Sequence, residues 1–243
     1  MLEATARAED RHFWFRGLRR NARLLLQRAV GARRDLVVLD CGAGTGRNLE
    51  WLGAFGRAIG IERSDVGLRL GRTRGRRTLA RGTVAHLPVA SSAVDVVTSF
   101  DVLYCLDDRT EHAAVAEMWR VLKPGGVALV NVAALDLLRG SHSALTMEQR
   151  RYTPARLSAL LTSAGFSIER MTFTNTTTFP LTLAVRLADQ WRGRTDVASD
   201  DDLQVPAAPV NALLSAAVAI DGALLRAINL PIGSSLMCVA RKK

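Results

Sequence analysis

A buried strand, a glycine-rich turn and a helix follow one another early in the chain, and this arrangement constrains the fold more than any other feature. Four apolar residues, Leu36–Leu39, precede Asp40, as in a parallel strand that is buried on both faces and ends in a carboxylate. Gly42, Gly44 and Gly46 let the chain turn sharply and let a ligand approach the backbone closely. The segment predicts a strand–turn–helix unit whose turn receives a nucleoside-like molecule.

A second acidic residue stands where it can contact a ribose. Glu62 ends the apolar run Ala58–Ile61, and a carboxylate at that point can accept hydrogen bonds from both ribose hydroxyls. A dinucleotide-binding protein shows the same pair of features, so these residues alone leave a nicotinamide cofactor open. The pattern over Asp40–Gly46 is D-x-G-x-G-x-G, whereas the dinucleotide pattern has two further residues between its second and third glycines.

Three later segments decide whether a nicotinamide cofactor or another nucleoside-containing cofactor is expected. In order along the chain, they are Arg81–Pro88, Val94–Leu103 and Leu122–Gly126. With Asp40–Gly46, they resemble the successive motifs of the class I S-adenosylmethionine-dependent methyltransferases. The resemblance implies S-adenosylmethionine as cofactor and S-adenosylhomocysteine as product.

The resemblance also implies roles for individual residues. Asp40 and the glycine turn would hold the aminocarboxypropyl end of the cofactor, Glu62 the ribose, and Arg63, Thr83 and Val84 the adenine. The predicted cofactor-binding residues are Asp40, Cys41, Gly42, Ala43, Gly44, Gly46, Glu62, Arg63, Thr83, Val84 and Phe100. The family usually has aspartate where Thr83 stands. A hydroxyl accepts from the adenine amine more weakly, so we expect a lower cofactor affinity or compensation by a neighbour.

The order of elements predicts an α/β fold with a doubly wound, mostly parallel seven-stranded sheet. Predicted strands lie near 36–40, 57–61, 78–81, 94–100 and 127–133, and predicted helices span 45–54, 65–72 and 109–121. Parallel connections need crossovers, which is why this alternation favours such a sheet. Thr153 and Pro154 begin a further helix that runs to Ser163. A sixth strand follows over Phe166–Thr174, and a seventh over Ser235–Arg241, which the resemblance implies is antiparallel.

Four segments are expected along the chain. They are an N-terminal helical cap (1–30), the methyltransferase core (31–175), a helical insertion (176–230) and the last core strand (231–243). The insertion contains apolar, helix-like stretches at Phe179–Trp191 and Val210–Ile228 on either side of an acidic break, Asp196–Asp202. An insertion here lies near the carboxyl ends of the strands and can form a lid over the methyl acceptor. A dimer surface or a membrane-facing patch are the alternatives.

Composition restricts the remaining possibilities. The 243 residues are 48% hydrophobic, which is enough for a sizeable core. Neither a long uncharged apolar stretch nor a basic start followed by an apolar segment is present, so a cytoplasmic protein is expected. Cys41, Cys105 and Cys238 lie in apolar runs and are odd in number, which indicates reduced core thiols. No metal is expected.

The net charge of +10 raises the question of nucleic acid. Lysine occurs only at Lys123, Lys242 and Lys243, so the basic character comes from arginine, as a codon bias would produce. The arginines cluster at Arg69, Arg72, Arg74, Arg76, Arg77 and Arg81. Such a cluster can meet phosphates, a carrier protein or an anionic membrane, but more often it is a solvated face. Few aromatic residues are interleaved with it, so nucleic acid is disfavoured as a partner.

The chain is also similar to a narrower branch of these methyltransferases. That branch begins with a helix of the type His-Trp-Trp-Phe-Arg-Gly-Arg-Arg, which His12–Arg20 resembles, and its Arg-Arg-Tyr-Thr segment matches Arg150–Thr153. Ala133, Ser143 and Glu148 stand where the branch has proline, aspartate and histidine. Because these departures fall in the expected acceptor pocket, the acceptor can differ from that of the relatives.

The candidate catalytic residues are His142, then His12 and Tyr104. Histidine titrates near neutral pH and suits proton removal, although a structural hydrogen bond is the commoner role for a residue such as His12. Tyr104 follows the fourth strand, so topology places it near the reaction. The predicted substrate-binding residues are Trp14, Phe15, Arg16, Tyr104, Arg151, Tyr152, Asn175 and Phe179. The arginines beside Tyr152 could hold an anionic group of the acceptor or bind carboxylates within the fold.

These features favour methyl transfer by in-line displacement to an oxygen, nitrogen or carbon atom of a small molecule. A specialised metabolite or a lipid-linked or sugar intermediate is the expected acceptor class. Contact with a membrane or a carrier through the basic and apolar faces, and a homodimer, are left open. An RNA or other nucleic-acid methyltransferase is the main alternative, although no Asn-Pro-Pro-aromatic signature is present. A non-catalytic cofactor-binding partner protein is the other.

Overall fold

The computed structural model of the protein describes residues 1–139, 148–191 and 204–243. Within these segments, seven strands form one sheet in the order β3-β2-β1-β4-β5-β7-β6. The strands are β1 Leu36–Cys41, β2 Gly56–Glu62, β3 Leu79–Arg81, β4 Val94–Phe100, β5 Leu122–Ala133, β6 Phe166–Thr174 and β7 Ser235–Lys242. All neighbours pair in parallel except β7, which is antiparallel to β5 and β6. The predicted α/β fold with a mostly parallel seven-stranded sheet is confirmed.

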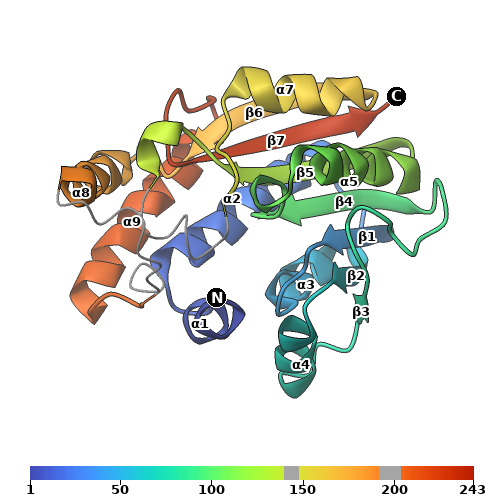
Figure 1. The fold of residues 1–243 in the computed structure, drawn as a ribbon, viewed down its shortest axis with the longest axis horizontal. Helices are drawn as coiled ribbons and strands as arrows, with labels where there is room; N and C mark the ends of the chain where they lie inside the picture. The colour runs from blue at the N-terminus through green and yellow to red at the C-terminus, as the bar shows by residue number, and fades with distance from the viewer. Residues whose placement is uncertain (140–147, 192–203) are drawn as a thin grey trace.

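Helices cover both faces of this sheet (Figure 1). They are α1 Leu2–Ala8, α2 Phe13–Val30, α3 Arg47–Leu52, α4 Asp65–Thr73, α5 Asp108–Val121, α7 Pro154–Ser163, α8 Phe179–Trp191 and α9 Ala208–Leu224. Helices α5 and α7 pack on one face, and α2 and α3 on the other. Helices α8 and α9 lie toward the end of the sheet to which the arrow of β4 points (Figure 1).

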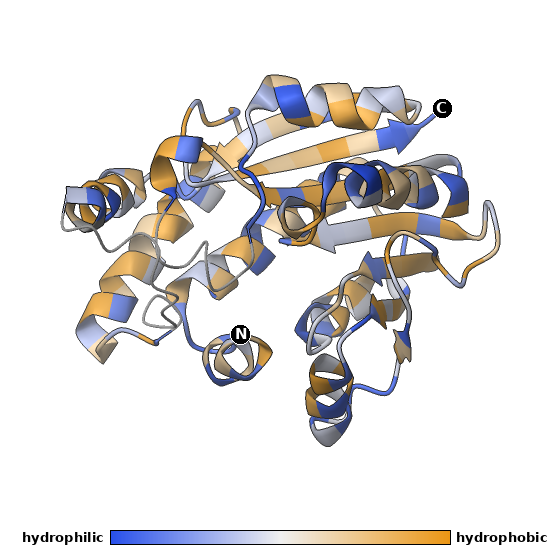
Figure 2. Cartoon of the chain, in the orientation of Figure 1, coloured by the Kyte–Doolittle hydropathy of each residue, from blue (hydrophilic) through white to orange (hydrophobic). Residues whose placement is uncertain are grey.

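The core consists of two apolar layers, one on each face of the sheet. Every residue of β4 is buried, as a central parallel strand covered on both sides requires. One layer joins Met118 of α5 and Leu157 of α7 to the strands, and the other joins Leu26 of α2 and Leu52 of α3 to them. Figure 2 shows the central strands as mainly hydrophobic, whereas the outer helices carry hydrophilic residues as well. Burial of this surface is the main favourable contribution to folding.

The N-terminal region forms two helices where the sequence predicted one helical stretch. The chain leaves α1 at Glu9 and starts α2 after His12, whose ring accepts a hydrogen bond from the Trp14 amide. The side chain of His12 therefore caps α2. Strand β5 also begins earlier than predicted, at Leu122, with an irregularity in its pairing to β4 before Val127.

The insertion forms the two predicted helices, which are α8 with the expected bounds and α9 at Ala208–Leu224. Helix α9 packs closely against α2: a Cβ added at Gly17 would lie 2.2 Å from Val218 Cγ1. The acidic break at 196–202 lies outside the described residues. In the part of the chain that the structure describes, no helix is both long enough and apolar enough to cross a bilayer.

Candidate functional site

The glycine turn follows β1 and is hydrogen-bonded to the end of β2. Gly42, Gly44 and Gly46 have φ angles of 79°, 56° and 77°, which only glycine adopts readily. The amides of Gly42 and Ala43 both donate to the carbonyl of Ile61, at 2.8 and 3.0 Å. Helix α3 then starts at Arg47, later than predicted, because the left-handed Gly46 precedes it. The turn is therefore held at the carboxyl edge of the sheet, where open α/β folds bind ligands.

Asp40 is a buried carboxyl group with one oxygen available. Its Oδ1 accepts a hydrogen bond from the Thr98 hydroxyl at 2.6 Å. Its Oδ2 makes no hydrogen bond within the described residues, although the side chain is buried. Burial raises the pKa of Asp40 to about 7, and the nearby charge of Glu62 adds to the increase. A cationic group of a ligand would both satisfy Oδ2 and favour the ionised form.

Glu62 lies directly against the glycine turn. Its Oε2 accepts from the Gly44 amide and its Oε1 from the Ser64 amide, both at 2.7 Å. A carboxylate oxygen has two lone pairs, so each oxygen can accept another hydrogen bond from a ligand hydroxyl. The structure thus brings the predicted ribose-binding residue and the predicted glycine turn into contact.

Of the residues predicted around the adenine, Arg63 follows β2, and Thr83 and Val84 follow β3. Gly82 donates its amide to the carbonyl of Glu62 at 3.1 Å, which places Thr83 beside the end of β2. The Thr83 hydroxyl accepts from the Ala85 amide at 3.3 Å, so part of its accepting capacity is already used. Val84 is buried and Arg63 is exposed.

Two predicted cofactor residues lie in the core. The ring of Phe100 packs 6.2 Å from that of Trp51, between centroids, in the apolar layer beneath α3. Cys41 is fully buried, and burial raises the pKa of its thiol far above the ordinary value. Its side chain therefore acts as a small apolar residue, and only its backbone can contribute to the turn.

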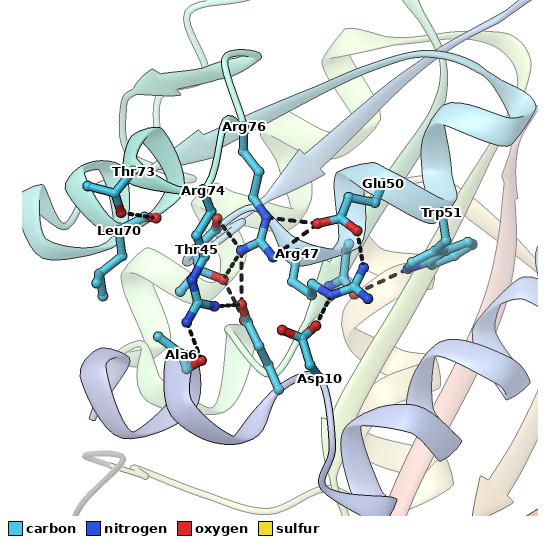
Figure 3. A network of polar contacts seen from close by, with 12 residues as sticks. Ala6, Asp10, Thr45, Arg47, Glu50, Trp51, Leu70, Thr73, Arg74 and Arg76 are labelled. Carbon is cyan, nitrogen blue, oxygen red and sulfur yellow. Dashed lines mark hydrogen bonds and ion pairs between the residues drawn. The ribbon is translucent and has the colours of Figure 1, made fainter.

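Glu9, at the end of helix α1, connects this helix to the glycine turn through a polar network that the sequence did not predict. Figure 3 shows the residues Thr45, Arg74 and Arg76 of this network. The buried carboxylate of Glu9 accepts from the Thr45 hydroxyl of the turn and from Arg74 and Arg76. Arg76 also bonds to Glu50 of α3 at 3.0 Å. A Cβ added at Gly44 would meet the Leu2 side chain at 3.5 Å. The cap is therefore tied to the turn, to α3 and to the segment after α4.

The same contacts account for part of the arginine cluster. Arg74 and Arg76 pair with Glu9, and Arg81 lies 3.2 Å from Asp65. These three side chains pair with carboxylates within the fold, whereas the sequence analysis expected the cluster to be a solvated face. The signal was weak in sequence, because Glu9 stands far from both partners along the chain.

Asp101 is a further functional candidate at the carboxyl edge of the sheet, and the sequence analysis missed it. It follows β4 directly and has a φ of 61°, which is uncommon for a residue with a side chain. Its Oδ1 accepts from Asn131 Nδ2 at 2.9 Å, and its amide donates to the Asn131 carbonyl at 3.0 Å. Burial raises the pKa of Asp101 to about 7. The available signal was a carboxylate at the end of the strand next to β1.

The predicted catalytic residues have different environments. His142 lies outside the described residues. The Nδ1 atom of His12 accepts from the Trp14 amide at 3.2 Å, which places the proton of a neutral ring on Nε2. Tyr104 is buried, and desolvation together with the charge of Asp101 raises the pKa of its phenol well above the ordinary value. Tyr104 therefore suits hydrogen-bond donation better than proton removal.

The predicted substrate residues on α2 are accessible. Trp14 and Phe15 are half-buried, with ring centroids 5.0 Å apart in an edge-to-face arrangement, and Arg16 is exposed. Helix α9 is fastened beside them, because Asn211 accepts from the Phe13 amide at 2.9 Å. An aromatic surface is thus available at the N-terminal end of α2.

The other predicted substrate residues hold neighbouring segments together. Tyr152 is fully buried and donates its hydroxyl to Glu111, so an acceptor contact would require rearrangement. Arg151 bonds to Glu148 at 2.7 Å and to a backbone carbonyl. Asn175 is buried and donates to the hydroxyls of Ser234 and Ser235 at 3.3 Å, and Phe179 is also buried. The side chains of Tyr152, Arg151 and Asn175 are thus engaged in hydrogen bonds within the fold.

Comparison with known proteins agrees with this arrangement. Residues 39–130 match the family model described as a methyltransferase domain. A "Probable S-adenosylmethionine-dependent methyltransferase" of Mycolicibacterium smegmatis is 32% identical over 163 residues, which cover 66% of this chain and 62% of that protein. The ubiquinone/menaquinone biosynthesis C-methyltransferase UbiE of Klebsiella pneumoniae is 34% identical over 112 residues, covering 41% of this chain and 43% of its own length.

A solved structure shows the same fold. The 1,6-didemethyltoxoflavin-N1-methyltransferase of Burkholderia thailandensis, with bound 1,6-didemethyltoxoflavin and S-adenosylhomocysteine, superposes with a TM-score of 0.55. It is 17% identical, and the match covers 93% of this chain and 78% of that one. The chain spans less than two thirds of the length of the curated relatives named above. The fold, the domain match and the motif order place this chain in the family of class I S-adenosylmethionine-dependent methyltransferases.

Proposed function

We propose that this protein transfers a methyl group from S-adenosylmethionine to an oxygen, nitrogen or carbon atom of a small organic acceptor. The observation that carries this proposal is a pair of carboxyl groups at the carboxyl ends of the adjacent parallel strands β1 and β4, the buried Asp40 and the half-buried Asp101. One carboxyl group would face the cofactor and the other the acceptor. The acceptor class that we favour is a specialised metabolite or a lipid-linked or sugar intermediate.

The residues around the glycine turn fit this cofactor. The unpaired Oδ2 of Asp40 suits the ammonium group of a methionine moiety, and Glu62 suits the ribose hydroxyls. When bound, S-adenosylmethionine supplies a methyl group that its sulfonium already activates. The chain itself then has to orient the acceptor in line with that methyl group and exclude water. Helix α1 covers the turn and serves the second task.

For acceptors that lose a proton, Asp101 is the base that the geometry favours. Asn131 orients its carboxylate through a 2.9 Å hydrogen bond, and burial brings the pKa of Asp101 to about 7, near the value at which a base works best. Asp101 also lies close enough to Tyr104 and Cys105 to influence both. His142 stays the base candidate that the sequence predicts.

The activity is tested with cofactor that carries a labelled methyl group. We expect label to pass into small molecules when the protein is incubated with phenols, amines, quinols and sugar conjugates, and not into total RNA. Transfer to RNA instead would contradict the proposed acceptor class and support the nucleic-acid alternative. Tight cofactor binding without transfer to any acceptor would indicate a non-catalytic partner protein.

Asp101→Asn tests the base directly, since it keeps the shape of the side chain and removes its capacity to take a proton. With an acceptor that loses a proton, we expect kcat to fall by about 10²- to 10⁴-fold while the cofactor Kd is unchanged. The wild-type rate should increase with pH through about 7, and the variant should lose this dependence. Asp35→Asn, an exposed change at the opposite end of the neighbouring strand, is the control. Full turnover of Asp101→Asn at every pH would leave alignment, or His142, as the source of catalysis.

A further inference from the structure

A basic groove lies between α2 and α9, away from the glycine turn. It has a volume of about 410 Å³, and its charged lining residues are Arg20, Arg23 and Arg226. The floor is open because Ala219 and Gly222 of α9 are small, and a Cβ added at Gly222 would already approach the Arg20 side chain to 3.3 Å. The groove is thus formed by close helix packing at glycine and bordered by guanidinium groups.

These three arginines differ from those near the cofactor site. In the described part of the chain, Arg20, Arg23 and Arg226 form no side-chain hydrogen bond or ion pair, whereas Arg74 and Arg76 are neutralised by Glu9. Beside Gly222 lies the buried amide of Asn21, whose Nδ2 and Oδ1 have no partner there either. The groove therefore presents positive charge that the fold does not compensate.

Next to the groove, α9 exposes an apolar stripe. Leu213, Ile220 and Leu224 are spaced seven and four residues apart, so they share one face of the helix. Their exposed fractions are 71%, 55% and 41%. Figure 2 shows α9 as largely hydrophobic. The groove and the stripe border each other, because the lining residues Ala219 and Ala223 stand next to Ile220 and Leu224 along α9, and Arg226 follows the end of the helix.

We propose that this face of α2 and α9 docks on an anionic lipid bilayer. The guanidinium groups of Arg20, Arg23 and Arg226 would meet lipid phosphates, and the stripe of α9 would enter the boundary between headgroups and acyl chains. A bilayer matches both the charge and the apolar area. A nucleic acid would leave the aliphatic stripe in water. A two-fold dimer would place the unpaired arginines of one copy against the same arginines of the other, and like charges repel. The inference does not depend on the identity of the methyl acceptor.

The test is sedimentation of the whole protein with vesicles. We expect binding to vesicles that contain phosphatidylglycerol, weak binding to phosphatidylcholine alone, and release by salt. The groove variant combines Arg20→Gln, Arg23→Gln and Arg226→Gln. Each of the three substitutions should weaken partition into the vesicles about fivefold. The matched control is Arg69→Gln, Arg72→Gln and Arg77→Gln, which removes the same charge from exposed positions in and after α4 and should weaken it less.

A second variant separates the apolar contribution from charge. Leu213→Ser with Ile220→Ser keeps all arginines and changes only exposed side chains, so we expect the fold, followed by circular dichroism, to persist while vesicle binding falls. Equal losses in the groove and control triple variants would overturn the proposal. So would displacement of the protein from vesicles by inorganic phosphate at matched ionic strength, or a dimer in light scattering that the serine variant abolishes.

Discussion

At the scale of single residues, the site depends on carboxyl groups that the fold removes from water. Asp40 accepts a hydrogen bond from the Thr98 hydroxyl, and Asp101 accepts one from the Asn131 amide. An unpaired carboxylate in such a place is unfavourable, because neither water nor a cation stabilises its charge. A ligand that brings a cationic group or a hydrogen-bond donor to either carboxylate would therefore stabilise its charge.

Asp40→Asn should separate ligand binding from folding. Loss of a hydrogen bond to a charged group is worth about 1.5–3 kcal/mol, so we expect the Kd for S-adenosylhomocysteine to rise by about 10- to 100-fold in calorimetry. The melting temperature of the free protein should stay the same or increase, since the buried charge is removed. An unchanged Kd, with Asp35→Asn as the reference, would show that the assigned pocket is wrong.

At the scale of elements, the docking of α1 is the feature that most extends the core fold. Helix α1 is only seven residues long, so isolated helix propensity cannot hold it in place. Its position depends on Glu9, which connects it to the turn and to Arg74 and Arg76. The first helix of the predicted N-terminal cap is thus held in place mainly by one acidic residue at its C-terminal end.

Glu9→Gln should loosen this element. It leaves the buried Arg76 without its main carboxylate, and breaking a buried pair costs about 3–5 kcal/mol, an upper limit here because Arg74 is partly exposed. We expect lower stability in urea, faster proteolysis before residue 12 and weaker cofactor binding. Asp10→Asn, which affects an exposed pair with Arg47, should change stability by less than about 1 kcal/mol. Equal stability of the two variants would contradict the assigned role of Glu9.

At the scale of the whole molecule, stability should depend on pH through groups with opposite shifts. Burial raises the pKa of Asp40 and of Asp101 to about 7, so the folded chain holds their protons more tightly than the unfolded chain does. Their contribution is complete below about pH 4 and is lost as the pH rises through about 7. For Asp95, burial would raise the pKa, but the Val37 amide and Lys123 hold it below its ordinary value. Its contribution is present above about pH 4 and lost on acidification.

We therefore expect the free energy of unfolding of the ligand-free protein to decrease between about pH 5 and about pH 8. One pKa unit corresponds to about 1.4 kcal/mol, so each buried carboxyl contributes at most about 4 kcal/mol to the change. Urea titrations across this range give the slope, and the double variant Asp40→Asn with Asp101→Asn should flatten it. A stability that instead increases over this range would show that both groups are ionised in the folded chain at low pH.

Local patterns were enough to predict most of the fold. The strand before Asp40, the glycines after it and the carboxylate of Glu62 belong to short segments whose ends a parallel sheet must bring to one edge. Contacts between distant segments were not predictable in the same way. Glu9 with Arg76, and Asp101 with Asn131, are pairs that only the assembled sheet and helices bring together. The break at His12 was missed because apolar spacing continues across it and a histidine cap is uncommon.

The docking of α1 on the glycine turn has a kinetic consequence. A cofactor bound against Gly44, as proposed, would exchange only when the contacts of Glu9 with Thr45 and Arg76 open, because these contacts hold α1 and its Leu2 over the turn. Exit of the spent cofactor, more than chemistry, would then set the steady-state turnover, with a burst in the first cycle. Salt weakens the partly exposed contact to Arg74, so moderate ionic strength should accelerate later cycles while leaving the burst unchanged.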